Sequence, residues 1–167
     1  MRRESKINLI ILFSALLLAI VLFFLVNLFT LEYRGEGYGI SGNGNLGLLF
    51  IFPAVPVYLF MLIFVYKVGG SYYRHRKNIT TLSVILLSLL CFSVYGECYL
   101  IHSLLHHLGG GPNSPDSVIY RFGWLNQYTN TLYFNFYSFT IGVLLTLLIC
   151  SCVEIFRRRK IRQAQQL

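Results

Sequence analysis

Four apolar blocks dominate this sequence, and each is long enough to cross a lipid bilayer as a helix. They cover residues 7–30, 48–68, 79–101 and 132–156. Crossing ~30 Å of hydrocarbon takes about 20 mostly apolar residues. Backbone polar groups inside lipid must be bonded within the chain, and the alternation typical of a transmembrane β-strand is absent. The sequence therefore predicts an all-α polytopic membrane protein, with four transmembrane helices in a bundle that forms one domain.

Composition supports the membrane prediction. Hydrophobic residues make up 56% of the chain and charged residues only 12%, whereas water-soluble domains carry about 25% charged residues. The first block is longer than the apolar region of a signal peptide, which spans about 7–15 residues, and no typical cleavage site follows it. We therefore expect the first block to remain in the protein as a membrane anchor.

The basic residues predict the orientation of the chain. Twelve of the 14 Lys and Arg residues lie within residues 1–6, 67–77 and 157–162, and only Arg34 and Arg121 lie on the other side. Because basic flanks stay in the cytoplasm, we expect both termini to be cytoplasmic and residues 31–47 and 102–131 to form the outer loops. The expected location is the cell membrane, either a plasma membrane or a bacterial inner membrane.

The same distribution bears on partners. A net charge of +8 that is concentrated beside apolar blocks suits anionic lipid head groups, so the lipid bilayer is an expected partner and nucleic acid is not. The connection between the second and third blocks is short, which predicts that these two helices are antiparallel neighbours.

Glu97 lies within the apolar third block. We identify no other acid inside an apolar block. A charged side chain at the centre of a bilayer costs about 2.5–3.5 kcal/mol, and an intramembrane acid is by default a candidate functional group. We expect a partner from the second outer loop, with Arg121 as the best single candidate. The alternative is that Glu97 reaches the interface or makes a structural hydrogen bond.

Cys98, His102 and His106 come after Glu97 in the chain. They are spaced four residues apart and therefore share one face of the third span. Cysteine and histidine at this spacing suit zinc, copper or haem, but they equally suit a polar fringe at the interface, which we favour. We predict no cofactor and no metal. The four cysteines form no CxxC motif and lie at different expected depths, so we predict no disulfide.

The fourth span carries small residues at every fourth position: Ser138, Gly142, Thr146 and Cys150. Small residues allow close approach of helices in lipid. This stripe predicts a packing face, either within the chain or in self-association between chains.

Residues 118–128 of the second outer loop combine aromatic side chains with Arg, Asn and Gln. Such residues suit the membrane–water interface. We predict a short helix or turn lying on the outer surface, with a re-entrant segment as the alternative.

No paired-carboxylate, nucleophile–base or cofactor motif is present. We therefore predict a non-enzymatic accessory, assembly or regulatory factor, which acts on other membrane proteins through its outer loops and helix faces. One alternative is a small oligomeric transporter or channel. The other is a membrane redox or metal-binding enzyme centred on the outer end of the third span.

Overall fold

The computed structural model describes residues 3–35 and 44–165, and within these ranges it contains helices and no strand. The tip of the first outer loop, residues 36–43, lies outside the described residues. Four long helices correspond to the four apolar blocks: α1 Arg3–Leu28, α2 Leu48–Arg74, α3 Ile79–His107 and α5 Phe136–Ala164. Helix α1 ends before the end of its block at residue 30, and α5 begins after the predicted start at residue 132. All four are long and apolar enough to cross a membrane. The predicted all-α class with four membrane-spanning helices is confirmed.

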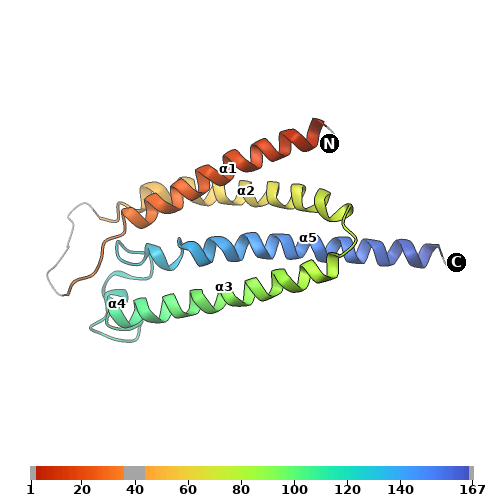
Figure 1. The fold of residues 1–167 in the computed structure, drawn as a ribbon. Helices are drawn as coiled ribbons and strands as arrows, with labels where there is room; N and C mark the ends of the chain where they lie inside the picture. The colour runs from red at the N-terminus through yellow and green to blue at the C-terminus, as the bar shows by residue number, and fades with distance from the viewer. Residues whose placement is uncertain (1–2, 36–43, 166–167) are drawn as a thin grey trace.

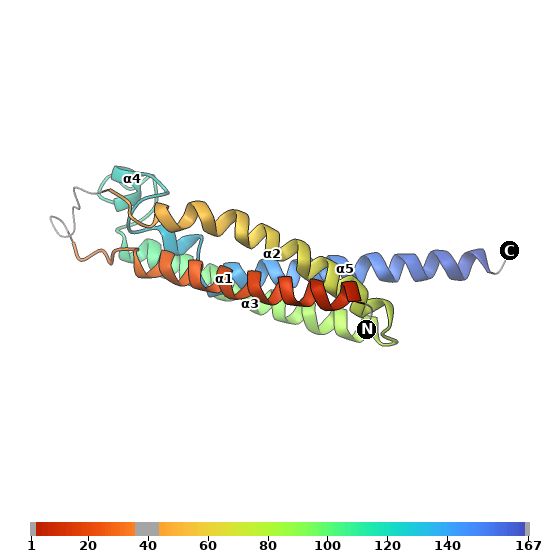
Figure 2. The same cartoon turned by 90° about the horizontal axis from the view of Figure 1, so that it is seen from above.

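The long helices run side by side in the packing order α1, α2, α5, α3 (Figures 1 and 2). Helix α2 therefore packs along α5, and α3 packs on the other side of α5. The predicted neighbours α2 and α3 instead lie on either side of α5 along most of their length. They come together near the connection between them, where Tyr73 and Ile79 belong to one core cluster. Both termini lie at one end of the molecule, and the C-terminal part of α5 extends beyond the other helices there (Figure 1).

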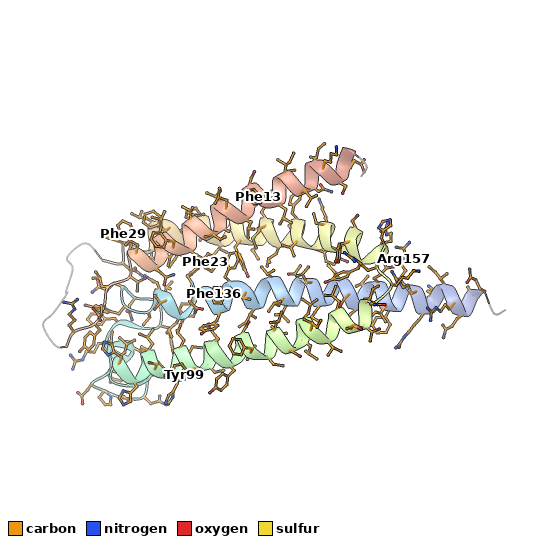
Figure 3. All side chains as sticks on the ribbon, viewed as in Figure 1. Phe13, Phe23, Phe29, Tyr99, Phe136 and Arg157 are labelled. Carbon is orange, nitrogen blue, oxygen red and sulfur yellow. The ribbon has the colours of Figure 1, made fainter. Side chains whose placement is uncertain are left out.

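Large apolar side chains cover the outside of the helices. Phe13, Phe52 and Phe92 are 69%, 74% and 70% exposed, and Tyr99 points outward from α3 (Figure 3). Contiguous apolar surface of this extent is rare on soluble monomers. The same surface matches hydrocarbon chains, so the exposed side chains agree with a position inside a membrane.

Aromatic rings join three of the helices. The ring of Phe23 on α1 lies 5.3 Å from that of Tyr58 on α2 and 5.1 Å from that of Phe139 on α5. The Tyr58 hydroxyl donates a 2.7 Å hydrogen bond to the Phe139 carbonyl. Because packing rather than expulsion from water stabilises helix contacts in lipid, this cluster is a main contact holding α1 and α2 to α5.

Two members of the predicted small-residue stripe, Gly142 and Cys150, lie at the contact between α5 and α2. A Cβ atom on Gly142 would overlap the hydroxyl of Tyr58, and one on Gly69 of α2 would lie 3.5 Å from the sulfur of Cys150. Cys150 Sγ also lies 3.4 Å from the Tyr66 carbonyl. Gly142 and Cys150 thus allow close packing within this chain. Self-association through the stripe stays a prediction.

Candidate functional site

The candidate site lies where α3 and α5 approach each other near the loop end of the molecule. Gly96 on α3 permits the approach, because a Cβ atom at this position would overlap the ring of Tyr137. Ser93, one turn earlier, is also buried and donates to the Leu89 carbonyl of its own helix. The next residue after Gly96 is Glu97, whose carboxylate therefore lies beside the start of α5.

Asn135 begins α5 and is the hydrogen-bond partner of Glu97. Its side-chain oxygen accepts from the backbone amides of Tyr137 and Ser138 at 2.7 and 3.0 Å, which makes it the N-cap of the helix. Its side-chain nitrogen donates to Glu97 Oε1 at 3.1 Å and to the Thr131 carbonyl at 3.0 Å. The Ser138 hydroxyl in turn accepts from the Asn135 amide at 3.1 Å, completing a capping box.

The second oxygen of the Glu97 carboxylate has no comparable partner. Glu97 Oε2 is buried, and no hydrogen-bond partner reaches it from any residue that the structure describes. Buried polar atoms are nearly always bonded, and an exception calls for a reason such as an unseen water, an ion or a functional role. A carboxyl group in this position is able to take up a proton or contact a small cation through Oε2.

Arg121 is not the residue that holds Glu97. It lies in the short helix α4, Val118–Phe122, and its guanidinium is 3.9 Å from the carboxylate of Asp116. Helix α4 begins at the N-cap Ser117, so Arg121 is one turn along, near the acid that precedes the cap. The expected pairing of Arg121 with Glu97 is replaced by the amide of Asn135.

Cys98, His102 and His106 all lie on α3, which continues to His107, and all three are exposed. No group of three His, Cys, Asp or Glu side chains comes within metal-binding distance in the ranges 3–35 and 44–165. The structure therefore does not join these residues to Glu97. The four cysteines are free thiols.

The α3–α5 connection (residues 108–135) is folded around its own small core, although only two short helical turns occur in it. Those turns are α4 and the 3-10 helix η1, Asn130–Leu132. Four buried side chains form the core: Leu108, Val118, Ile119 and Tyr128. The predicted short helix in residues 118–128 is present as α4, and its position on the outer membrane surface stays a prediction.

Buried polar side chains stabilise this connection, and the sequence analysis did not find them. Thr129 and Asn130 are fully buried. Thr129 donates to the Trp124 carbonyl at 2.7 Å, and Asn130 exchanges two hydrogen bonds of 2.9 and 2.8 Å with Asn45 in the first outer loop. Asn27 of α1 donates to the Phe134 carbonyl at 2.7 Å. The many Asn residues in these loops were the sequence feature that could have indicated buried hydrogen bonds.

One edge of the connection is apolar and exposed. Tyr120, Phe122, Trp124 and Leu125 are between 46% and 59% exposed. These four residues form what we call the aromatic edge. Aromatic side chains of this kind contribute strongly to interfaces, with proteins or with the membrane surface.

A second acid within the apolar spans lies in α5, near the end of the molecule that holds both termini. The sequence analysis did not identify it. Glu154 is 8% exposed, and its carboxylate lies 3.1 Å from Arg158 and 3.5 Å from Arg157. Arg158 also donates to the carbonyls of Tyr73 and Arg74 at 2.8 and 3.1 Å, which satisfies the C-terminus of α2. Glu97 is thus not the only acid within the apolar spans. The i, i+4 spacing of Glu154 and Arg158 was the signal.

Comparison of the chain with models of protein families, with curated proteins and with solved structures found no match.

Proposed function

We propose that this chain is a non-enzymatic accessory protein of the cell membrane, which binds another membrane protein through the α3–α5 connection. The supporting observation is the order of that connection. Segments longer than about 12–15 residues with little regular structure are uncommon and are usually functional or disordered. This one is held by its own core and by buried hydrogen bonds from Thr129 and Asn130, so a functional role is the better explanation.

The aromatic edge is the proposed contact surface. Large aromatic residues supply most of the binding energy at many protein interfaces, and here they project from a connection that has its own small core. Binding to a partner protein and insertion into the lipid interface predict different neighbours for the aromatic edge. In the first case, Phe122 and Trp124 contact one particular protein, whereas in the second they contact lipid alone.

Site-specific photocrosslinking separates these two cases. A photoreactive phenylalanine analogue at Phe122 or Trp124, introduced in native membranes, should give the same protein adduct from both positions. The matched control is the analogue at Asn113, which is exposed in the same connection but outside the aromatic edge. The adduct should also be lost in an Asn130→Ala background, because that change removes the bonds to Asn45. Lipid adducts alone from both positions would refute the proposal.

The proposed orientation places both termini in the cytoplasm and the α3–α5 connection outside. It is supported by the basic residues of the described chain, eleven of which lie within residues 3–6, 67–77 and 157–162, at the end that holds both termini. In a cysteine-free background, Asn113→Cys should react with a membrane-impermeant thiol reagent in intact cells. Gln165→Cys should react only after permeabilisation. Labelling of Gln165→Cys in intact cells would reverse the orientation.

A small oligomeric transporter is the second candidate, and the unbonded oxygen of Glu97 favours it. If Glu97 carries a proton or cation across the membrane, purified protein in liposomes should conduct a measurable flux. Glu97→Gln should abolish that flux while the melting temperature stays the same. Absence of any proton, sodium or potassium flux from the unaltered protein would exclude this candidate.

A further inference from the structure

A polar hollow lies between α1 and α2 at the end of the molecule that holds the termini. The N-terminal part of α1 diverges from the end of α2 there (Figure 1). The hollow has a volume of ≈910 Å³. Its lining comes from the first turns of α1 and from the last turns of α2 with the two residues that follow: Glu4, Ser5, Asn8 and Leu9, then Lys67, Val68, Ser71, Tyr72, Arg74, His75 and Arg76.

Positive charge predominates in this lining. Lys67, Arg74 and Arg76 line the hollow, and Glu4 is the only acid among the lining residues. Within residues 3–35 and 44–165, no carboxylate lies within ion-pair distance of any of the three cations. The Arg76 guanidinium stacks on the ring of Tyr72 at 4.5 Å, which positions the charge without neutralising it. The hollow therefore suits an anion.

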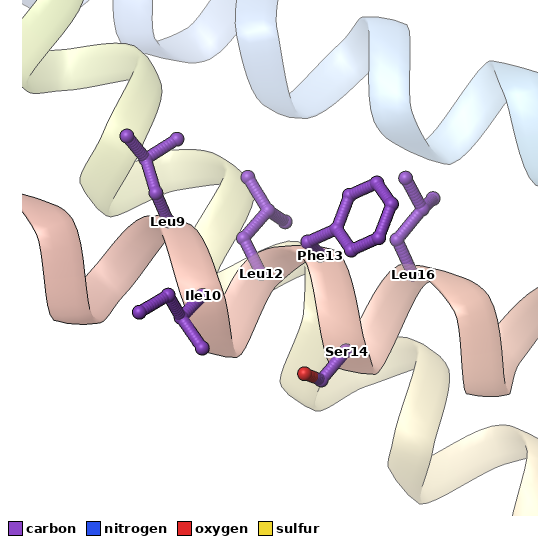
Figure 4. Close-up of a pocket in the computed structure, with 6 residues that line it drawn as sticks. All are labelled: Leu9, Ile10, Leu12, Phe13, Ser14 and Leu16. Carbon is purple, nitrogen blue, oxygen red and sulfur yellow. The ribbon is translucent and has the colours of Figure 1, made fainter.

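A second, apolar hollow of ≈440 Å³ lies along the next turns of α1, and all its lining residues belong to that helix. Leu9 is the one lining residue that the two hollows share, so they are neighbours on α1. In Figure 4, the side chains of Leu9, Leu12, Phe13 and Leu16 project from the same side of α1, and Ile10 and Ser14 project from the other. A basic hollow with an apolar surface of α1 beside it matches a molecule with an anionic head and a hydrocarbon chain.

We infer that this composite hollow binds one anionic phospholipid. The phosphate and the acidic headgroup contact Lys67, Arg74 and Arg76, and one acyl chain lies along Leu9 and Phe13. Basic pockets between transmembrane helices are established binding places for acidic head groups. A free phosphate ion would use the cations alone and leave the neighbouring apolar surface of α1 unused, so the shared lining residue Leu9 favours the lipid.

Native mass spectrometry of the purified protein in detergent tests this inference, with phosphatidylglycerol and phosphatidylcholine as probes. One molecule of phosphatidylglycerol should bind in preference to phosphatidylcholine. Each basic residue near an acidic head group contributes about fivefold to affinity, so replacing Lys67, Arg74 and Arg76 together by Gln should weaken phosphatidylglycerol binding about 100-fold. Inorganic phosphate at millimolar concentration should not displace the lipid.

The matched control removes three charges elsewhere. Arg159, Lys160 and Arg162 are exposed on the extension of α5 and line neither hollow, so their joint replacement by Gln should change binding less than threefold. Leu9→Trp keeps every charge but places a larger side chain where both hollows share a lining residue. It should reduce the affinity for phosphatidylglycerol at least fivefold without lowering the melting temperature. Any one of four results would overturn the inference. These are equal losses of binding in both triple variants, equal binding of phosphatidylcholine, full binding by Leu9→Trp, and displacement of the lipid by phosphate.

Discussion

Replacing Asn135 by Ala tests whether Glu97 is held by the start of α5. The substitution removes the N-cap of α5, which costs about 1 kcal/mol. It also removes the 3.1 Å hydrogen bond from the Asn135 amide to the Glu97 carboxylate, whose other oxygen is already without a partner among the described residues, and an unsatisfied buried group costs about 1–3 kcal/mol. We therefore expect a total loss of about 3 kcal/mol in the free energy of unfolding, or about 6–12 °C in melting temperature.

A double-mutant cycle separates the two contributions. In a Glu97→Leu background no carboxylate remains to be stranded, so Asn135→Ala should cost only the N-cap, about 1 kcal/mol. The coupling energy between the two positions is then about 1–3 kcal/mol. Glu97→Leu alone should be milder than Asn135→Ala, because the Asn135 amide keeps its bond to the Thr131 carbonyl. Glu97→Gln retains an acceptor for Asn135 and should be milder still.

The assay is thermal or denaturant unfolding of the purified protein in detergent, with Asn113→Ala as the control for an exposed asparagine. If Asn135→Ala costs the same in both backgrounds, the bond to Glu97 contributes nothing to stability. The site would then be reduced to a helix cap beside an unrelated acid.

Two further substitutions test the helix contacts by their melting temperatures. Gly142→Ala should destabilise the protein by about 1–2 kcal/mol, because the added methyl group displaces the hydroxyl of Tyr58. Gly70→Ala, where an added Cβ atom meets nothing, should be neutral or stabilising by up to about 1 kcal/mol, and an equal loss in both would refute the packing argument. Arg158→Ala should cost about 2 kcal/mol, since it removes a partner of a buried acid and two bonds to the end of α2. Arg159→Ala should stay within about 0.5 kcal/mol, and similar effects of the two arginine changes would contradict the role of Arg158.

The candidate site was only partly predictable. Glu97 was identifiable because an acid within an apolar run is expensive in lipid wherever it lies. Its partner was not, because Arg121 and Asn135 both lie far along the chain from Glu97, at a separation of 38 residues for Asn135, and the choice depends on how the connection folds. Helix α4 begins at Ser117 and places Arg121 beside Asp116, whereas the N-cap of α5 places Asn135 against α3.

The histidine and cysteine stripe shows the same limit. Helical spacing correctly placed Cys98, His102 and His106 on one helix, which continues to His107. Spacing along one helix does not predict which other helix, if any, packs against that face. In the structure the face is exposed, so these side chains receive no ligand-forming partner from another helix among the described residues.

The class of the protein follows from the four apolar blocks alone, because the bilayer imposes one requirement on every spanning segment. About 20 apolar residues in helical form satisfy it, whatever the neighbours are. The order in which the helices pack was decided only by tertiary structure. Every span has apolar faces, so hydrophobicity does not distinguish one neighbour from another in lipid. Local shape does: Gly142 receives Tyr58 and Gly96 receives Tyr137, and these contacts place α5 between α2 and α3.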